Sequence, residues 1–355
     1  MPTRIMSSPT VAMYAASWLL VTLVAPRISS ASTTDRGGTT TSGAARSAIV
    51  GPMRCGECHQ LEFAAWKETA HQRGFVAMHR LPAAKTIAKK LGIKRIKRDP
   101  SCVACHYTPA PDVATLKPTS GVSCESCHAP GRDWVDAHAT YGGPQATAET
   151  ETDEHKATRR DQSLAAGMNA PFRVADLARR CFDCHTIADQ RLVESGGHPA
   201  ASAGFELVAW LEGEVRHNYF FSPDKRNRVA TSERKRVLFV VGRGLALESG
   251  LRAWSSSRSD GRYLTAMTSL VAESKSALEV IAERTEIAEV TEMLASVEEL
   301  SPISARLEPD EMLSTAADRV ASAVRAFAAR SDGSDLAALD ELLPPASDFR
   351  GHALP

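Results

Sequence analysis

The pattern Cys-x-x-Cys-His occurs four times in this chain, and no other feature constrains the fold as strongly. Its copies are CGECH at Cys55–His59, CVACH at Cys102–His106, CESCH at Cys124–His128 and CFDCH at Cys181–His185. Two thiols at this spacing can each form a thioether with one vinyl group of a haem, and the histidine that follows then reaches the iron. The spacing therefore predicts four covalently bound c-type haems.

Each predicted haem takes two cysteines and one histidine from its own motif. The cysteines are Cys55, Cys58, Cys102, Cys105, Cys124, Cys127, Cys181 and Cys184, and the iron-coordinating histidines are His59, His106, His128 and His185. Structural zinc and disulfide bonds are the alternatives. Neither requires a histidine after every pair of cysteines, and the haem interpretation uses all eight cysteines of the chain.

A six-coordinate haem iron needs a second axial ligand. The histidines outside the motifs are His71, His79, His138, His155, His198, His217 and His352, which is enough to fill every sixth position. Two of them stand in a repeated layout, CGECHQLEFAAWKETAH and CESCHAPGRDWVDAH, in which a tryptophan follows the motif and a histidine follows the tryptophan. A helix leaving the motif would carry both on one face. We therefore predict His71 and His138 as distal ligands, each for its own haem or a neighbouring one.

His198 and His217 are the next candidates for distal ligands. His198 follows Gly196-Gly197, which lets the backbone approach closely, and precedes Pro199, which stiffens the chain. Neutral imidazole is the expected axial donor in both cases.

The remaining candidates are weaker. His79 lies close in sequence to His71, His155 lies in a polar run and is predicted to be solvated, and His352 is predicted to be disordered near the chain end. Methionine ligation stays open as an alternative that would raise the reduction potential of its haem. The methionines within the motif-bearing segment are Met53, Met78 and Met168.

The N-terminus has the pattern of a secretory signal. Arg4 precedes the apolar segment Val11–Ala25, and small residues near Ala31 suit cleavage, so residues 1–31 are predicted to be a signal peptide. The apolar segment is shorter than the ~20 residues of a membrane-spanning helix. We therefore expect a periplasmic protein without obligate membrane insertion; an uncleaved anchor is the alternative.

Three segments follow the predicted signal. Residues 32–50 are predicted to form a flexible linker, residues 51–225 a tetrahaem cytochrome domain, and residues 226–355 a helical C-terminal region. Apolar residues recur at helical spacing in Tyr263–Leu300 and Asp310–Arg330, which predicts a helical hairpin, with a short third helix in Ser334–Leu343. Arg234–Leu247 fits a buried strand or a helix. The expected fold class is all-α, with haems in place of side chains in much of the core.

Charge is unevenly distributed although the formal net charge is zero. Residues 54–128 hold 12 Lys and Arg against 6 Asp and Glu, whereas residues 260–343 hold 7 against 17. Seven of the cations fall in Lys85–Arg98. This run is either a solvated helical face, a docking surface for an acidic redox partner, or a set of counterions for haem propionates. Nucleic acid is not an expected partner, because no aromatic residues interleave with the cations.

The pattern resembles the tetrahaem cytochromes of the cytochrome c-554 type. The stretches that carry the resemblance are CGECHQLEFAAWKETAH, GVSCESCHAPGRDWVDAH and CFDCHTIADQRLVESGGH, within residues 54–220. The resemblance implies a mainly helical fold, electron transfer outside the cytoplasm, and mostly bis-histidine haems of which one can lack a distal ligand. The acidic helical tail after Asp260 departs from that family.

Electron transfer between redox partner proteins is the leading hypothesis for function. The free histidines suffice to block every iron, and no proton-transfer or nucleophilic set of residues accompanies the motifs. The sequence therefore indicates an electron carrier more than an enzyme. The alternative is a multihaem oxidoreductase acting on a small nitrogen or sulfur oxide at one five-coordinate haem. A third class is a haem-bearing structural or sensor subunit.

Overall fold

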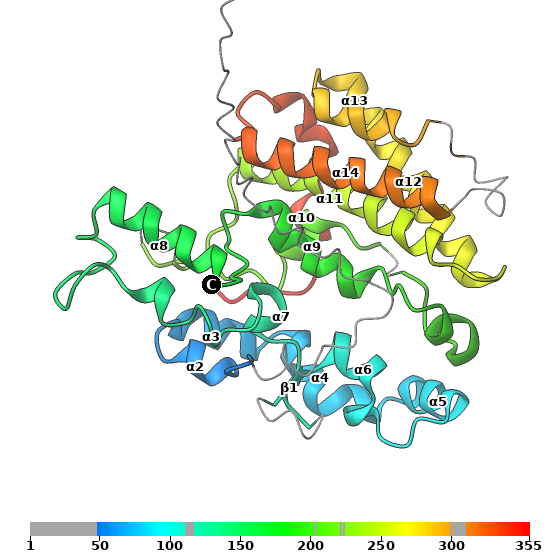
Figure 1. Ribbon diagram of the computed structural model, residues 1–355, viewed down its shortest axis with the longest axis horizontal. Helices are drawn as coiled ribbons and strands as arrows, with labels where there is room; N and C mark the ends of the chain where they lie inside the picture. The colour runs from blue at the N-terminus through cyan, green and yellow to red at the C-terminus, as the bar shows by residue number, and fades with distance from the viewer. Residues whose placement is uncertain are drawn as a thin grey trace, which may run out of the picture. The chain divides into compact units, whose positions relative to one another are not determined.

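The computed structural model describes residues 48–110, 117–201, 204–220, 222, 224–298, 300 and 310–355, and these residues are mainly helical (Figure 1). The described residues all belong to one compact unit, residues 37–355. The predicted signal peptide, residues 1–31, and nearly all of the predicted linker lie outside the described residues. The all-α prediction is confirmed.

The first half of the described chain consists of short elements. The helices are α2 (Pro52–Gly56), α3 (Gln60–Lys67), α4 (Ala70–Ala77), α5 (Pro82–Leu91), α6 (Pro100–His106), α7 (Cys124–His128), α8 (Asp153–Ala165), α9 (Val174–His185) and α10 (Leu207–Leu211). Single turns lie between them, namely η1 (Met78–Arg80), η2 (Ile96–Arg98), η3 (Ala137–Ala139) and η4 (Leu192–Gly196). Strands β1 (Thr108–Pro109) and β2 (Pro118–Ser120) form one antiparallel pair.

Local sequence explains where these helices begin and end. Proline occupies the first turn of α2, α5 and α6, where its missing N–H costs no hydrogen bond. The side chains of Thr69, Asp99 and Thr152 cap the N-termini of α4, α6 and α8. Gly92 ends α5 in the left-handed conformation, at φ 70°.

The second half contains the long helices α11 (Ser232–Ser255), α12 (Arg262–Arg284), α13 (Ala288–Ala295) and α14 (Asp310–Arg330), followed by the 3₁₀ turns η6 (Ala337–Leu342) and η7 (Ala346–Asp348). The predicted helix at Asp310–Arg330 is confirmed, and the predicted third helix is the 3₁₀ turn η6. The segment Tyr263–Leu300, predicted as one helix of a hairpin, is helical but divided into α12 and α13, because Thr285 and Ile287 have extended backbone conformations. The ambiguous segment Arg234–Leu247 is helical, as part of α11.

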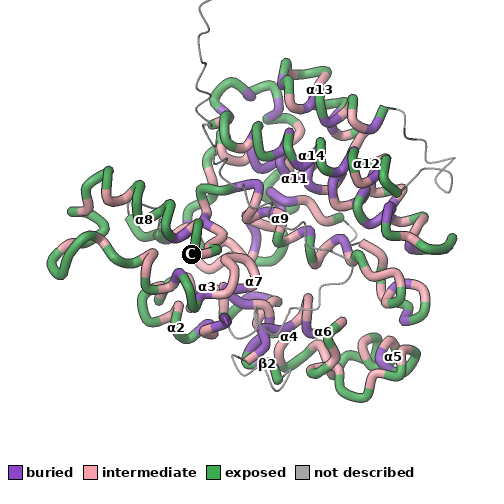
Figure 2. The backbone as a smooth tube through the Cα atoms, viewed as in Figure 1, coloured by how far each residue is buried: buried purple, intermediate pink, exposed green. Residues whose placement is uncertain are grey.

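Helix α11 is the centre of the C-terminal half. Both α12 and α14 pack along it, and its residues are buried on nearly every side (Figure 2). Gly244 allows α14 to approach closely, because a Cβ at this position would overlap the Val324 side chain and lie 2.9 Å from Met293 Sδ. A helix buried all round has no polar face, which explains why periodicity did not identify it.

The hydrophobic core is built from the C-terminal helices together with α9, α10 and η4. On α9, the side chains of Val174, Ala178 and Phe182 are buried in this core. Before residue 170, the buried apolar side chains of the described chain are few and scattered: Ala48, Ile49, Ala65, Ala88, Val103, Tyr107 and Trp134. This distribution suits a first half that packs around cofactors. The predicted boundary after residue 225 stays a prediction, and the packing of α9 crosses it.

None of the described helices has the length and hydropathy needed to cross a membrane.

Candidate haem sites

Four pairs of histidine rings face one another, and each pair joins a motif histidine to a histidine outside the motifs. The ring centroids lie 6.1 Å apart for His59 and His138, 6.3 Å for His185 and His71, 6.3 Å for His106 and His198, and 6.4 Å for His128 and His217. The structure thus brings all eight predicted axial histidines together in pairs. All four pairs take their second ring from an element far along the chain from the motif.

The spacing fits one coordinated metal ion between the two rings. A nitrogen–metal bond of about 2.0–2.1 Å on each side, with roughly 1.1 Å from the nitrogen to the ring centre, separates two axial imidazoles by about 6.3 Å between centroids. All eight cysteines are free thiols, and within the described ranges no group of three or more His, Cys, Asp and Glu side chains is arranged to hold a metal ion. The ring spacing and the free thiols of each motif are compatible with a haem that two histidines would hold.

Backbone carbonyls orient four of the rings. Nδ1 of His128 lies 3.0 Å from Asn169 O, and the same nitrogen of His138 lies 2.6 Å from Val135 O. Nδ1 of His198 lies 2.9 Å from Pro199 O and that of His217 lies 2.7 Å from Val215 O. A hydrogen bond from Nδ1 fixes the tautomer and leaves Nε2 with a lone pair for a metal ion, as is usual for metal-binding histidines.

Burial keeps several of these rings neutral. It lowers the pKa of His106, His128 and His185 to about 4, and it also lowers the pKa of His71 and His138. A metal ion is bound by the neutral imidazole. The rings are therefore in the ligand form at neutral pH without having to lose a proton.

Thiols of different motifs lie within hydrogen-bonding reach of one another. The contact with Cys124 lowers the pKa of the Cys55 thiol, and the contact with Cys184 lowers that of the Cys105 thiol. Burial raises the pKa of Cys102 to about 11. The first motif therefore adjoins the third, and the second adjoins the fourth.

The predicted single helix carrying a tryptophan and a histidine is wrong in both places. After Trp66 the chain leaves α3, and Thr69 Oγ1 caps a new helix, α4, that carries His71. His138 lies in the 3₁₀ turn η3, after a turn that contains Trp134. The Thr69 hydroxyl accepts a hydrogen bond from the backbone N–H of Gln72, which is the geometry of a helix N-cap. This cap explains why the chain starts a new helix between Trp66 and His71.

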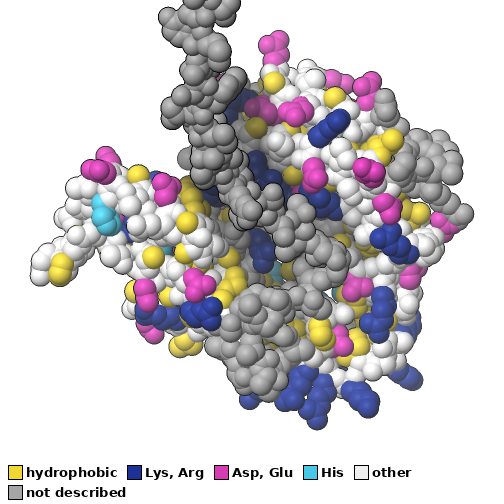
Figure 3. Space-filling view, viewed as in Figure 1, with side chains coloured by type: hydrophobic (Ala, Val, Ile, Leu, Met, Phe, Trp, Pro, Cys, Tyr) yellow, Lys and Arg dark blue, Asp and Glu magenta, His cyan; other side chains and the backbone are white. Residues whose placement is uncertain are grey.

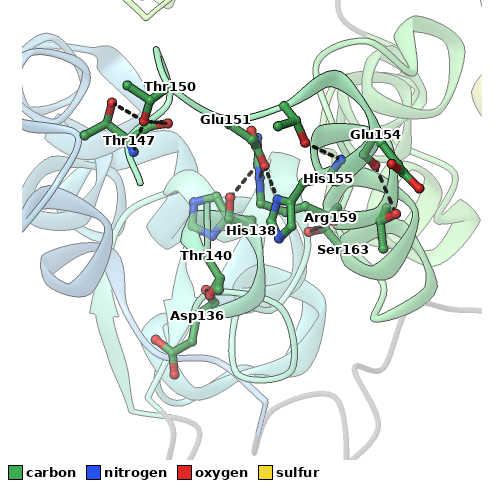
Figure 4. Close-up of polar contacts among 12 residues, drawn as sticks. Asp136, His138, Thr140, Thr147, Thr150, Glu151, Glu154, His155, Arg159 and Ser163 are labelled. Atoms are coloured by element: carbon green, nitrogen blue, oxygen red, sulfur yellow. Dashed lines mark hydrogen bonds and ion pairs between the residues drawn. The ribbon is translucent and has the colours of Figure 1, made fainter. Parts of the chain in front are cut away.

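A polar network on α8 holds the turn that carries His138 (Figure 4). Arg159 Nη1 donates to the backbone oxygen of His138 at 2.7 Å, and Arg159 Nε donates to Glu151 Oε1 at 2.7 Å. His155 Nδ1 lies 2.6 Å from the same Glu151 oxygen, and the Glu151 side chain is 1% exposed. His155 was predicted to be solvated; it is instead half-buried against a carboxylate, because α8 packs its side against η3.

Glycines position the backbone beside His198, as the sequence indicated. A Cβ at Gly196 would lie 2.9 Å from Leu91 Cδ1 on α5, and Gly197 has φ 82°. The close packing of α5 on η4 therefore depends on Gly196. It sets the position of the segment that carries His198.

The end of the chain supports the segment that carries His217. Asn227 Nδ2 donates to Leu354 O at 2.7 Å and Tyr219 Oη donates to Pro355 O at 3.0 Å. The prediction of disorder around His352 is therefore wrong. The sequence did not predict that the last residues of the chain support the segment with His217, because these residues contain no recognisable motif.

Sequence reasoning also missed two aromatic residues beside His185. The Phe205 ring stacks on it at 4.5 Å and 10°, and the Trp210 ring lies 4.9 Å away. Of the other candidate ligands, Met53 is 70% exposed and His79 belongs to none of the four histidine pairs.

Glu151→Gln is expected to reduce the loss of stability in acid. Hydrogen bonds from Arg159, and secondarily from His155, lower the pKa of Glu151 from 4.5 to about 2. The folded chain then holds fewer protons at this site than the unfolded chain, so its contribution is present above pH 4.5 and is lost as the pH falls toward 2. Denaturant unfolding across this window should show a steeper loss in the parent than in the variant. Glu154→Gln, on the exposed side of α8, should behave like the parent; parallel profiles for parent and Glu151→Gln would contradict the assignment.

Comparison with known proteins gives two matches. The model of the family described as "Cytochrome c554 and c-prime" matches residues 54–129. The chain is 32% identical over 154 residues to cytochrome c-554 of Nitrosomonas europaea, a match that covers 40% of this chain and 59% of that relative. The chain thus spans about three fifths of the relative's length. No solved structure matches.

Proposed function

We propose that this chain is a periplasmic electron-transfer protein of the cytochrome c-554 type with four c-type haems, each held between two histidines. The match of residues 54–129 to the family model and the similarity to cytochrome c-554 support this proposal. The observation that carries the proposal is the set of four facing histidine pairs, with centroid distances between 6.1 and 6.4 Å. When bound, a c-type haem supplies an iron centre that takes up and releases single electrons.

Each proposed haem takes its thioethers from one motif and its axial ligands from two parts of the chain. The ligand pairs are His59 with His138, His106 with His198, His128 with His217, and His185 with His71. Ligands at both axial positions leave no site on the iron for a substrate, which favours an electron carrier over an enzyme. The contacts between thiols of the first and third motifs, and of the second and fourth, support haems close enough to exchange electrons.

The proposed localisation and the proposed redox partners rest on the sequence. The predicted signal peptide supports export to the periplasm, where c-type haems are attached, and the donor and acceptor are redox proteins. A multihaem oxidoreductase would need one iron without its second histidine, so the coordination state of the four irons separates the two functions.

We predict that the mature protein carries four haems and that none of them binds carbon monoxide. The intact mass should exceed that of the processed polypeptide by four haem masses, and the reduced protein should keep its spectrum under carbon monoxide. A gain of three haem masses or fewer, from cells with working haem-attachment machinery, would contradict the count. One carbon monoxide bound per molecule of the parent would favour the oxidoreductase.

A further inference from the structure

The segment from Arg80 to Arg98 forms a basic surface at one end of the molecule. Its cations are Arg80, Lys85, Lys89, Lys90, Lys94, Arg95, Lys97 and Arg98, with no acidic residue between the first and the last. All of them except Lys97 are exposed. In Figure 3 dark-blue side chains gather at the lower edge and the right of the view, around the α5 end. We refer to these eight residues as the α5 surface.

The charges of the α5 surface are not compensated by acidic residues of the described chain. No carboxylate of the described chain forms an ion pair with any of the eight, whereas arginines elsewhere, such as Arg159, Arg236 and Arg330, do pair with acids. Burial and the nearby Arg80 lower the pKa of Lys97, whose Nζ lies 3.7 Å from the centre of the Phe75 ring. Like charges held together without partners oppose folding. Their concentration therefore needs another explanation.

The α5 surface adjoins both elements that carry the ligands of one proposed haem. Turn η2 leads directly into α6, which contains Cys102, Cys105 and His106. Helix α5 packs on η4, which leads into His198. Arg191 beside η4 also donates to Leu91 O at the end of α5, at 3.1 Å.

We propose that the α5 surface docks an acidic redox protein and that electrons pass between this partner and the haem at Cys102 and Cys105. The inference rests on the proposed function and adds the surface, the charge of the partner and the haem of entry or exit. The cations steer an acidic partner and orient it, which raises the association rate far more than the stability of the complex. The α5 surface also contains a hollow of about 520 Å³, which residues such as His79, Lys85 and Lys97 line.

The packing of α5 favours a protein over an anionic membrane as the binding partner. Membrane-surface helices bury their apolar face among the lipids. In α5 that face is already used, since Ile87 and Leu91 pack against Gly196 and Ala88 is buried. The helix can offer only its charged side.

The test measures how fast an acidic protein reduces the holoprotein. Photoreduced plant-type ferredoxin, an acidic protein of low potential, serves as the protein reductant, and photoreduced 5-deazariboflavin serves as the small one. The triple variant Lys85→Gln, Lys89→Gln, Lys94→Gln should lower the second-order rate constant with ferredoxin at least tenfold at low ionic strength. Its rate with deazariboflavin should equal that of the parent.

A control variant removes the same number of positive charges from outside the α5 surface. Lys67→Gln, Lys156→Gln, Lys275→Gln takes lysines from α3, α8 and α12 and should change the ferredoxin rate less than twofold. Equal slowing by the two triple variants, or none by either, would overturn the proposal. Loss of binding to vesicles containing phosphatidylserine, with an unchanged ferredoxin rate, would overturn it in favour of a membrane. A parent that deazariboflavin cannot reduce reversibly would instead refute the proposed electron-transfer function.

Discussion

His71→Ala and His138→Ala are each expected to convert one low-spin haem into a high-spin, five-coordinate haem. The ring of His71 faces that of His185, and the ring of His138 faces that of His59, at distances that suit one iron between them. Removing one imidazole leaves a vacancy on the iron, which weakens its ligand field. Each variant should show one new high-spin signal by electron paramagnetic resonance and should bind one carbon monoxide when reduced.

Combining these variants with loss of a motif tests the pairing itself. In a Cys181→Ala, Cys184→Ala background, which lacks the fourth haem, His71→Ala should add no high-spin signal, whereas His138→Ala should still add one. His352→Ala is the matched control, because its side chain is exposed and its ring belongs to none of the four pairs. Parent-like spectra for the His71 and His138 variants would remove both residues from the ligand set and return the role to His79 or a methionine.

The sequence predicts candidate haem ligands but not which of them lie together. The motifs are local, so the eight cysteines and four histidines are predicted from spacing alone. The repeated tryptophan context selects His71 and His138 and the two glycines select His198, whereas no such context marks His217. Pairing depends on long-range packing. His59 meets His138 only because α8 and Glu151 hold η3 through Arg159, and none of these residues belongs to a motif.

The same difference between local sequence patterns and long-range packing explains which helices the sequence could predict. The amphipathic helix α14 has the predicted bounds, Asp310–Arg330, since one face is apolar and the other is charged. Helix α11 was ambiguous because both α12 and α14 cover it. The contact between α9 and α11 was not anticipated, because the apolar face of α9 begins before the fourth motif, at Val174 and Ala178, and ends inside it, at Phe182.

The contact between α9 and α11 changes the expected effect of removing the C-terminal helices on haem attachment. Since the tail from Tyr263 to Leu343 contains no Cys or His, the sequence alone predicts that haem attachment survives its loss. The structure instead buries Val174, Ala178 and Phe182 of α9 in the same core as α11 and α14. Truncation after Arg252 would remove α12 and α14 from this core and leave α11 as the main cover of α9, whose last turns carry Cys181, Cys184 and His185.

The apolar burial that the truncation removes is large enough to predict a large loss of stability. Helix α14 alone buries four large apolar side chains, Leu313, Val320, Val324 and Phe327. At about 1.5–3 kcal/mol each, their loss is comparable to the whole stability of a domain, roughly 5–15 kcal/mol. We expect the truncated protein to carry three haems or fewer, or to be degraded, as measured by intact mass and haem-stained gels. A soluble fragment with four haems would show that the first half folds alone and would support a boundary near residue 225.

A point substitution tests the same packing in the full-length chain. Gly244→Ala places a methyl group against Val324 and Met293 in the α11–α14 contact, and overpacking of this kind typically costs about 1–3 kcal/mol. The melting temperature should therefore fall while the mass still shows four haems, because α9 stays covered. Gly143→Ala, where an added Cβ meets nothing within 4 Å, is the control and should melt like the parent. If Gly244→Ala also melts like the parent, the close approach of α11 and α14 does not contribute to stability, and the expected effect of the truncation loses its physical basis.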